Sequence, residues 1–325
     1  MKLEYLLEMT KISIITPVLN EEDNVLDCYN EIKNLFKEKL FDYDYEHIFV
    51  DNMSDDSSVK KITALCQGDK KVKLIMNNQN YGILPSIYNS LKFCVSDYTV
   101  VCYAADLQDP VEFIFDAIKK IESEKAEIVY AVRNQREENI FYKYIKKIYY
   151  SLAKLVTQNK LRPNVNVFQL ISNNVRLEIL QTETNNPFIP YLLQSNSFKK
   201  IGIETKWLKR KKNKAKNNFF SLFAEAKNAI FNYSGVGSTL SFSISIVLFL
   251  FTVFLLSFNT IFLVLNKLNL YKTEVVSGIP TLIIFNLIAF SAIFLILGTI
   301  AENINHLLQI KIGKKVRIKK KINFE

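Results

Sequence analysis

Three clusters of carboxylate and amide side chains each follow a short apolar run in the first 110 residues. They are Asn20-Glu21, Asp51–Asp56 and Asp106–Asp109. The carboxyl ends of parallel strands meet at one edge of a sheet, and ligands bind there in proteins of this kind. A single aspartate at such a position is more often a turn or cap residue. Three clusters on one edge favour a binding site instead.

The side chains in these clusters are oxygen donors that suit a hard divalent cation. The carboxylate of Asp106 and the side-chain carbonyl of Gln108 are ligand types for Mg²⁺ or Mn²⁺. The eight glycines of the chain occur in neither the dinucleotide-binding nor the phosphate-loop spacing. A bound diphosphate would therefore need a cation to neutralise its charge. Asp51, which follows a strand, is a candidate acceptor of hydrogen bonds from a base or a ribose.

Strand-like and helix-like patterns alternate along the chain from Lys11 to Ala131. Strands are predicted at 12–16 (ended by Pro17), 45–50, 72–76, 98–103 and 126–132, and helices at 21–40, 84–95 and 111–124. A further helix is predicted at 140–156. The alternation predicts an α/β fold, with a mostly parallel sheet covered by helices on both faces.

Cysteine and charge patterns exclude two other classes of protein. The four cysteines lie in apolar stretches without C-x-x-C spacing, which favours buried, reduced thiols over a zinc site. The net charge is +10, and its densest basic runs are Lys206–Lys216 and Lys311–Lys321. These runs flank an apolar region, so we interpret them as contacts with membrane lipids. A nucleic-acid-binding function lacks a supporting motif.

Two long stretches of the C-terminal third contain no charged residue. They are Asn228–Asn266 and Val275–Ala301, and they predict transmembrane helices at about 240–265 and 277–301. The basic outer flanks place both termini in the cytoplasm by the positive-inside rule. The chain is thus predicted to be a multi-pass protein of the inner or plasma membrane. Paired hairpins commonly associate, so a homo-oligomer is an open expectation.

These patterns divide the chain into four parts. A cytoplasmic catalytic domain is predicted at 1–215 and two transmembrane helices at 237–303. A basic cytoplasmic tail is predicted at 304–325. Between the domain and the helices, residues 216–236 are predicted to form a juxtamembrane amphipathic helix. A core helix is the alternative for the aromatic stretch at 219–231.

Four segments resemble family 2 glycosyltransferases with the nucleotide-diphospho-sugar transferase (GT-A) fold. Ile14–Glu22 is similar to their opening strand and loop, and Val50–Ser57 to their uridine- or guanosine-binding loop. Ala104–Glu112 resembles the D-x-D-L-Q-D-P-P-E segment of the dolichol-phosphate mannose synthase branch, and Ala131–Glu138 its G-x-R-x-x-R-E-E stretch. The two-helix hairpin fits the polyprenyl-phosphate glycosyltransferases of that branch.

The resemblance implies an inverting transfer of a sugar from a UDP- or GDP-linked donor to a polyprenyl phosphate or lipid-linked glycan. Asp106 and Gln108 would hold Mg²⁺ or Mn²⁺ on the diphosphate. Arg133 would contact the diphosphate or the acceptor phosphate, which makes Asp106 and Arg133 the candidate catalytic residues. The nucleotide pocket would be lined by Pro17, Leu19, Asn20, Glu21, Asp51 and Ser54.

The chain departs from the family pattern at several positions, three of them in the motifs of the donor and acceptor sites. Ala104 replaces the first aspartate of D-x-D, and Val167 and Gln169 replace the acidic residue and the arginine of the acceptor-side motif G-D-F-R-L. These changes keep open a second hypothesis, a degenerate membrane-anchored relative that acts as a binding or scaffold protein. A processive polysaccharide synthase is disfavoured, because its Q-x-x-R-W motif is absent and the only tryptophan is Trp207.

Overall fold

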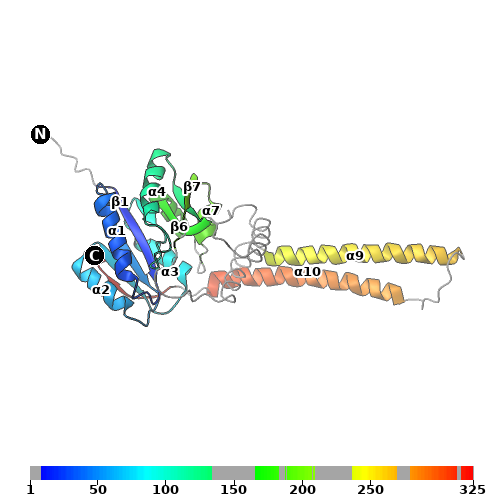
Figure 1. Ribbon diagram of the computed structural model, residues 1–325. Coiled ribbons are helices and arrows are strands. Elements are labelled where there is room, and N and C mark those ends of the chain that lie inside the picture. Colours follow the sequence, from blue (N-terminus) through cyan, green and yellow to red (C-terminus); the bar gives the residue numbers. More distant parts are fainter. Residues whose placement is uncertain are drawn as a thin grey trace. The chain divides into compact units, whose positions relative to one another are not determined.

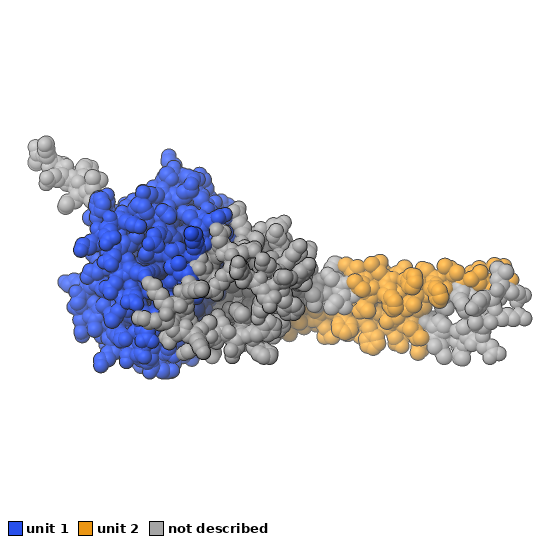
Figure 2. Space-filling model, in the orientation of Figure 1, with its two compact units in different colours: residues 1–219, 312–325 blue, residues 220–311 orange. Residues whose placement is uncertain are grey.

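The structure is a computed structural model that describes residues 9–133, 165–182, 187, 189–206, 208, 236–268, 279–312 and 316–324. The chain forms two compact units, residues 1–219 with 312–325 and residues 220–311 (Figure 2). The helices predicted at 140–156 and 216–236 lie outside the described residues, as does the basic stretch at 209–216.

The first unit is built around one eight-stranded mixed sheet in the order β7-β5-β6-β4-β1-β2-β3-β8 (Figure 1). Four neighbouring pairs are parallel, namely β1 with β2, β1 with β4, β2 with β3 and β5 with β7. The other three pairs are antiparallel. This confirms the predicted α/β fold with a mostly parallel sheet. The strands are β1 (Lys11–Val18), β2 (Asp44–Asp51), β3 (Val72–Asn77), β4 (Tyr98–Val100), β5 (Ile128–Arg133), β6 (Val165–Ser172), β7 (Lys200–Thr205) and β8 (Ile318–Ile322).

Helices cover both faces of the sheet, as the alternation predicted. One face packs against α1 (Val25–Glu38), α2 (Ser58–Gly68) and α4 (Glu112–Ser123). The other packs against α3 (Ile83–Ser90), the 3₁₀ turn η1 (Leu91–Phe93), α6 (Asn173–Gln181) and α7 (Ile189–Ser195).

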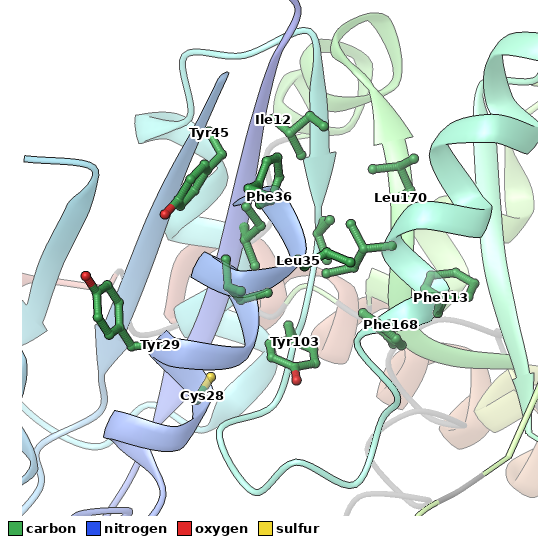
Figure 3. Close-up of a cluster of buried hydrophobic side chains, with 14 of the residues drawn as sticks. Ile12, Cys28, Tyr29, Leu35, Phe36, Tyr45, Tyr103, Phe113, Phe168 and Leu170 are labelled. Carbon is green, nitrogen blue, oxygen red and sulfur yellow. The ribbon is translucent and has the colours of Figure 1, made fainter. Parts of the chain in front are cut away.

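The strands supply both cores because their side chains alternate between the two faces. In β1, Ile12 and Ile14 belong to the cluster under α1, whereas Ile15 belongs to the opposite cluster. Figure 3 shows the first cluster, in which the rings of Phe113 and Phe168 lie 4.5 Å apart between centroids. Each such buried side chain stabilises the fold by about 1.5–3 kcal/mol relative to exposure. The helices are thereby fixed against the sheet that carries the loops.

Two predicted strand boundaries are wrong. Strand β1 continues through Pro17 to Val18, because the nitrogen of Pro17 faces the β4 side of the sheet, where the ladder with β1 ends at Ile14. A missing N–H therefore breaks no ladder bond there. The strand predicted at 98–103 already ends at Val100. Beyond it, the amide of Tyr103 still donates to the Ile15 carbonyl at 2.8 Å.

The second unit contains two long helices, α9 (Val236–Lys267) and α10 (Ile279–Ile312). Among the described residues, one helical stretch is long and apolar enough to cross a membrane, Leu282–Ala301 of α10. A shorter apolar stretch of α9 covers Ser245–Phe258. Only 17% of the α10 stretch is buried, and large side chains such as Phe285 are exposed. Such exposure differs from the core helix of a water-soluble protein and suits contact with lipid.

Strand β8 lies within the region predicted as a basic tail. It pairs antiparallel with β3, so that Leu74 faces Ile322 and Ile75 faces Lys321. The side-chain amide of Asn323 fixes its far end by donating to the carbonyls of Cys66 and Val72 at 2.7 and 2.9 Å. The chain thus returns to the sheet after both long helices.

Glu46 of β2 is a buried carboxylate that holds three strands together. It accepts hydrogen bonds from Lys73 Nζ at 2.7 Å and from the Val95 amide at 3.0 Å, and Ser13 also donates to it. Burial acts to raise its pKa, but the bonds from Lys73 and Ser13 outweigh burial and hold the pKa below 4.5. A lowered folded-state pKa contributes stability above the unfolded pKa, and this stability is lost as the pH falls through the folded value.

We therefore expect Glu46→Gln to lower the free energy of unfolding by about 1–3 kcal/mol at pH 7, because a buried charged bond is broken. The difference from wild type should shrink as the pH falls below the usual range of a glutamate, because the wild type then loses the stability that its lowered pKa contributes. Urea unfolding of the detergent-solubilised chain at pH 7 and pH 4 measures both effects. The control is Asp44→Asn in the same strand, whose ion pair with Lys71 is exposed and is expected to matter by less than about 1 kcal/mol.

Candidate active site

The predicted site segments lie at one edge of the sheet, the edge at which the parallel strands end. Strands β4, β1 and β2 are neighbours and run parallel, so the loops after Val100, Val18 and Asp51 meet there. This confirms that the three acidic clusters share an edge. Strand β5 runs in the same direction and ends at Arg133, and the antiparallel β6 begins beside it at Val165.

The loops after β1 and β2 are interlocked by hydrogen bonds between backbone and side chains. The Asn20 amide donates to Ser54 Oγ at 2.9 Å, and the Asp55 amide donates to Asn20 Oδ1 at 2.8 Å. The Glu21 amide donates to Ser58 Oγ at 2.9 Å. Asn20 has a φ of 56°, in the left-handed region that asparagine tolerates better than most residues. The two loops therefore form a single rigid unit.

A second reciprocal pair strengthens this unit. The Glu22 amide donates to Asp56 Oδ2 at 3.1 Å, and the Ser57 amide donates to Glu22 Oε2 at 3.0 Å. Partial burial acts to raise the pKa of Asp56, but hydrogen bonds from Ser58 outweigh it and lower that pKa. Asp56 is consequently a carboxylate at neutral pH and can keep its bond to the Glu22 amide.

Asp51, a predicted nucleotide contact, closes β2 with a buried carboxyl group that is 2% exposed. It accepts from the amides of Met53 and Ser54, each at 3.2 Å, and so builds the turn that carries Ser54. Burial raises its pKa despite these bonds. Met53 has a φ of 70°, which places a strained residue at the mouth of this loop.

The loop after β4 carries the predicted metal ligands. Asp106 Oδ1 accepts a bond from the Gln108 amide at 3.3 Å, and the residue between them, Leu107, has a φ of 56° and is 1% exposed. The Leu107 amide donates to the Ala104 carbonyl at 3.2 Å, which closes the turn. A left-handed leucine costs about 1–2 kcal/mol, and its burial in the core offsets that cost. Asp106 and Gln108 are thus held at a fixed spacing.

The donor set at this loop fits a cation that takes most of its ligands from substrate. In the described part of the chain no three His, Cys, Asp or Glu side chains gather as a metal site. Mg²⁺ commonly binds through one or two carboxylates together with phosphate oxygens and water. A single carboxylate at Asp106 with the amide oxygen of Gln108 agrees with that mode.

The acceptor-side segment lies in the sheet rather than in a loop. Phe168, Gln169 and Leu170 of β6 are fully buried, and the Gln169 carbonyl accepts from the Val101 amide at 2.9 Å. Val167, one step nearer the edge, is partly buried against the second core cluster. For Arg133 the structure describes the backbone only, at the last position of β5. Gln169, which stands where the motif has an arginine, is therefore buried in the sheet between Phe168 and Leu170.

A buried amide cluster beneath the loops was not predicted. Asn52 Oδ1 accepts from Asn77 Nδ2 at 3.3 Å, from Ser86 Oγ at 3.0 Å and from the Tyr81 amide at 3.0 Å. Asn52 Nδ2 donates to Asn80 Oδ1 at 2.6 Å. The Asn52 amide donates to the Val18 carbonyl at 2.9 Å, so the cluster connects β1, β2 and α3. In the sequence, the cluster is indicated only by Asn52 and Asn77, which lie at the ends of two successive strands.

The interlocked loops and the Asp106 loop define an α/β protein whose polar loops meet at the carboxyl edge of its sheet, the edge at which such proteins bind ligands. Residues 13–180, more than half of the chain, match the family model described as glycosyl transferase family 2. The chain belongs to this family of glycosyltransferases.

The chain is also similar to curated bacterial proteins. It is 28% identical over 305 residues to the uncharacterized glycosyltransferase YkcC of Bacillus subtilis (strain 168), covering 91% of this chain and 88% of the relative. It is 32% identical over 110 residues to a prophage bactoprenol glucosyl transferase homolog of Escherichia coli (strain K12). That second match spans about a third of each protein, 34% of this chain and 35% of the relative.

Two solved structures are more distant. The first is Staphylococcus aureus TarS 1–349 in complex with UDP-GlcNAc, at 13% identity and a TM-score of 0.47, covering 69% of this chain and 66% of TarS. The second is the mannosyltransferase PcManGT from Pyrobaculum calidifontis in complex with GDP-Man and Mn²⁺, at 12% identity and a TM-score of 0.43, covering 90% and 86%.

The amide cluster provides a test of the site's architecture. Asn52→Ala removes the acceptor shared by Asn77, Ser86 and the Tyr81 amide, and we expect it to lower the free energy of unfolding by about 1–3 kcal/mol. The matched control is Asn30→Ala on the exposed side of α1, expected to change it by less than about 0.5 kcal/mol. Urea unfolding measures both, and equal effects of the two substitutions would show that the cluster is not structural.

Proposed function

We propose that this family 2 glycosyltransferase moves a sugar, with inversion, from a UDP- or GDP-linked donor to a polyprenyl phosphate or a lipid-linked glycan at the membrane. The binding of the donor is supported by one observation: the two interlocked loops and the Asp106–Gln108 turn follow neighbouring strands at one edge of the sheet. The loops would line the nucleotide pocket through Pro17, Leu19, Asn20, Glu21, Asp51 and Ser54, and the turn would face the diphosphate.

In the proposed reaction, an oxygen of the acceptor attacks the anomeric carbon while the bond to the nucleoside diphosphate breaks on the opposite side. Mg²⁺ or Mn²⁺, when bound, would stabilise the negative charge on the departing diphosphate. Asp106 and Gln108 would hold it, and Arg133 would contact the diphosphate or the acceptor phosphate. A phosphate acceptor is ionised at neutral pH, so the chain needs no strong general base for this step.

The membrane half of the proposal is supported by strand pairing. Strand β3 precedes the two long helices in the chain and β8 follows them, yet they are neighbours in one sheet. Both strands must therefore lie on the same side of a membrane, which requires an even number of crossings between them. If Leu282–Ala301 crosses, a second segment must cross as well, and α9 with its apolar stretch Ser245–Phe258 is the candidate. This argument supports a multi-pass hairpin whose catalytic domain and tail are cytoplasmic, with basic flanks on that side.

The names of relatives support a lipid acceptor. Several are called bactoprenol glucosyl transferase, and bactoprenol is a polyprenyl lipid. The matched stretch comprises about a third of those proteins. A polyprenyl acceptor is therefore proposed for this chain by similarity to these relatives.

A second function, a membrane-anchored binding or scaffold protein, is favoured by one observation. Gln169 stands where the family supplies an arginine, and it is fully buried in the sheet. Together with Val167, it leaves the acceptor side with fewer charged groups than the family pattern, and Ala104 removes one carboxylate that could bind the metal or the ribose. Such a protein would bind the nucleotide-sugar without transferring the sugar.

A substitution at Asp106 distinguishes the transferase from the binding or scaffold protein. Loss of the metal's carboxylate ligand should remove several kcal/mol of transition-state stabilisation, so we expect Asp106→Asn to reduce kcat/KM by about 10²–10³-fold. Transfer of labelled sugar from UDP- and GDP-sugars to a polyprenyl phosphate in membranes, with and without EDTA, measures this. Asp42→Asn, at an exposed position before β2, is the control. Wild-type binding of a nucleotide-sugar without any transfer would favour the scaffold function.

The hairpin can be tested by cysteine labelling, since the four native cysteines are all buried. An impermeant maleimide should label Asn269→Cys, in the predicted connector between the helices, from outside intact cells. It should label Lys319→Cys, at an exposed position of β8, only after permeabilisation. Protection of both positions in intact cells would contradict a spanning hairpin.

A further inference from the structure

Strand β8 reaches the same edge of the sheet as the candidate nucleotide loops. Because it runs antiparallel to β3, its first residues meet the end of β3, where Asn77 faces Ile318. The ladder continues one step further, since the Asn78 amide donates to the Arg317 carbonyl at 3.0 Å. A segment that follows α10 in the chain therefore lies beside the loop that follows β3.

Tyr81 connects this segment to the loop. Its hydroxyl accepts a hydrogen bond from the Arg317 amide at 3.1 Å and donates one to Asn78 Oδ1 at 2.7 Å. Its own amide donates to Asn52 Oδ1 at 3.0 Å. One residue thus binds β8 with its side chain and the buried amide cluster with its backbone.

The amide cluster continues the connection into the interlocked loops. Asn52 follows directly on Asp51, whose carboxylate holds the amides of Met53 and Ser54. Ser54 Oγ in turn accepts from the Asn20 amide. A connection made of hydrogen bonds and one step along the chain, from Asn52 to Asp51, therefore runs from Arg317 through Tyr81 to both loops that would bind the nucleotide.

We propose that Tyr81 is a positioning residue that couples β8 to the two interlocked loops, so that β8 is part of the nucleotide site without touching the ligand. The identity of the ligand rests on the proposed function, whereas the coupling does not. The far end of β8 is anchored independently, because Asn323 binds the carbonyls of Cys66 and Val72 and Ile322 packs on the core. A strand fixed at both ends can restrain the loop it contacts.

The simpler role for β8 is to cover the edge of β3, as edge strands with several lysines often do. That role predicts lower stability without β8 but no change in the loops. The coupling predicts that loss of the Tyr81 hydroxyl loosens residues 51–58 and 78–82 while the fold stays intact. The two roles therefore differ in where the effect is seen.

Hydrogen exchange of the unliganded, detergent-solubilised full chain tests the coupling. In Tyr81→Phe, peptides covering 51–58 and 78–82 should exchange about 2–10-fold faster, the effect of one lost hydrogen bond, while 112–123 in α4 stays unchanged. Asn323→Gly, which keeps the left-handed φ of 62° but frees the far end of β8, should give the same pattern. Tyr43→Phe is the matched control, because the Tyr43 hydroxyl binds Glu122 and has no link to β8.

Calorimetric titration of the same variants with UDP and with GDP, each with Mn²⁺, adds the binding readout. Whichever nucleotide the wild type binds should bind about 2–10-fold more weakly to Tyr81→Phe and to Asn323→Gly, and equally to Tyr43→Phe. Unchanged exchange at 51–58 in both variants, with wild-type affinity, would overturn the coupling and leave the donor site standing. Faster exchange with no nucleotide binding by the wild type would uphold the coupling and refute the proposed donor.

Discussion

The candidate site depends on the parallel register of β4, β1 and β2. The pairing of Val18 with Asp51 sets the two strand ends level, so the loops that follow start from the same height at the sheet edge. Because the strand ends are level, the Asn20 amide reaches Ser54 Oγ at 2.9 Å. A slip of one residue would turn every side chain to the opposite face and would exchange the two core clusters. The hydrophobic core and the polar loops are therefore specified by the same set of pairings.

Strain at this edge is concentrated where the chemistry is proposed. Asn20, Met53 and Leu107 have φ values of 56°, 70° and 56°, and each lies in one of the three loops. The surroundings hold them in place, by hydrogen bonds at Asn20 and by burial at Leu107. Loops held in one conformation lose less entropy when they bind a ligand. A rigid receiving surface suits a donor whose diphosphate must be placed accurately relative to an acceptor.

The sequence predicted the first half of the sheet well because its signals are local. Apolar runs closed by polar clusters marked β1, β2 and β4, and parallel geometry alone brought their ends together. The end of β1 was missed because proline is a strand breaker only where its nitrogen faces a partner, and Pro17 faces none. All the predicted contacts of the site residues, from Pro17 to Arg133, remain predictions, since they concern a ligand.

Long-range pairing was the feature that the sequence could not supply. Ile318–Ile322 reads as a basic segment, and nothing local indicates that it pairs with a strand about 240 residues earlier. The amide cluster was missed for a related reason. Asn52, Asn77 and Ser86 are ordinary polar residues in sequence, and their importance follows from burial that only the tertiary structure reveals.

The place of β8 in the chain has a consequence for biosynthesis. The ribosome makes β3 first, then both apolar helices, and only afterwards the strand that covers the edge of β3. Until the segment that follows the helices has been made and has paired, the nascent domain presents unpaired backbone groups along that edge. An open edge of this kind promotes aggregation and attracts chaperones. In the membrane hairpin that we propose, completion of the sheet would mark chains inserted with both ends of the hairpin on the same side, and incorrectly inserted chains would keep the edge exposed.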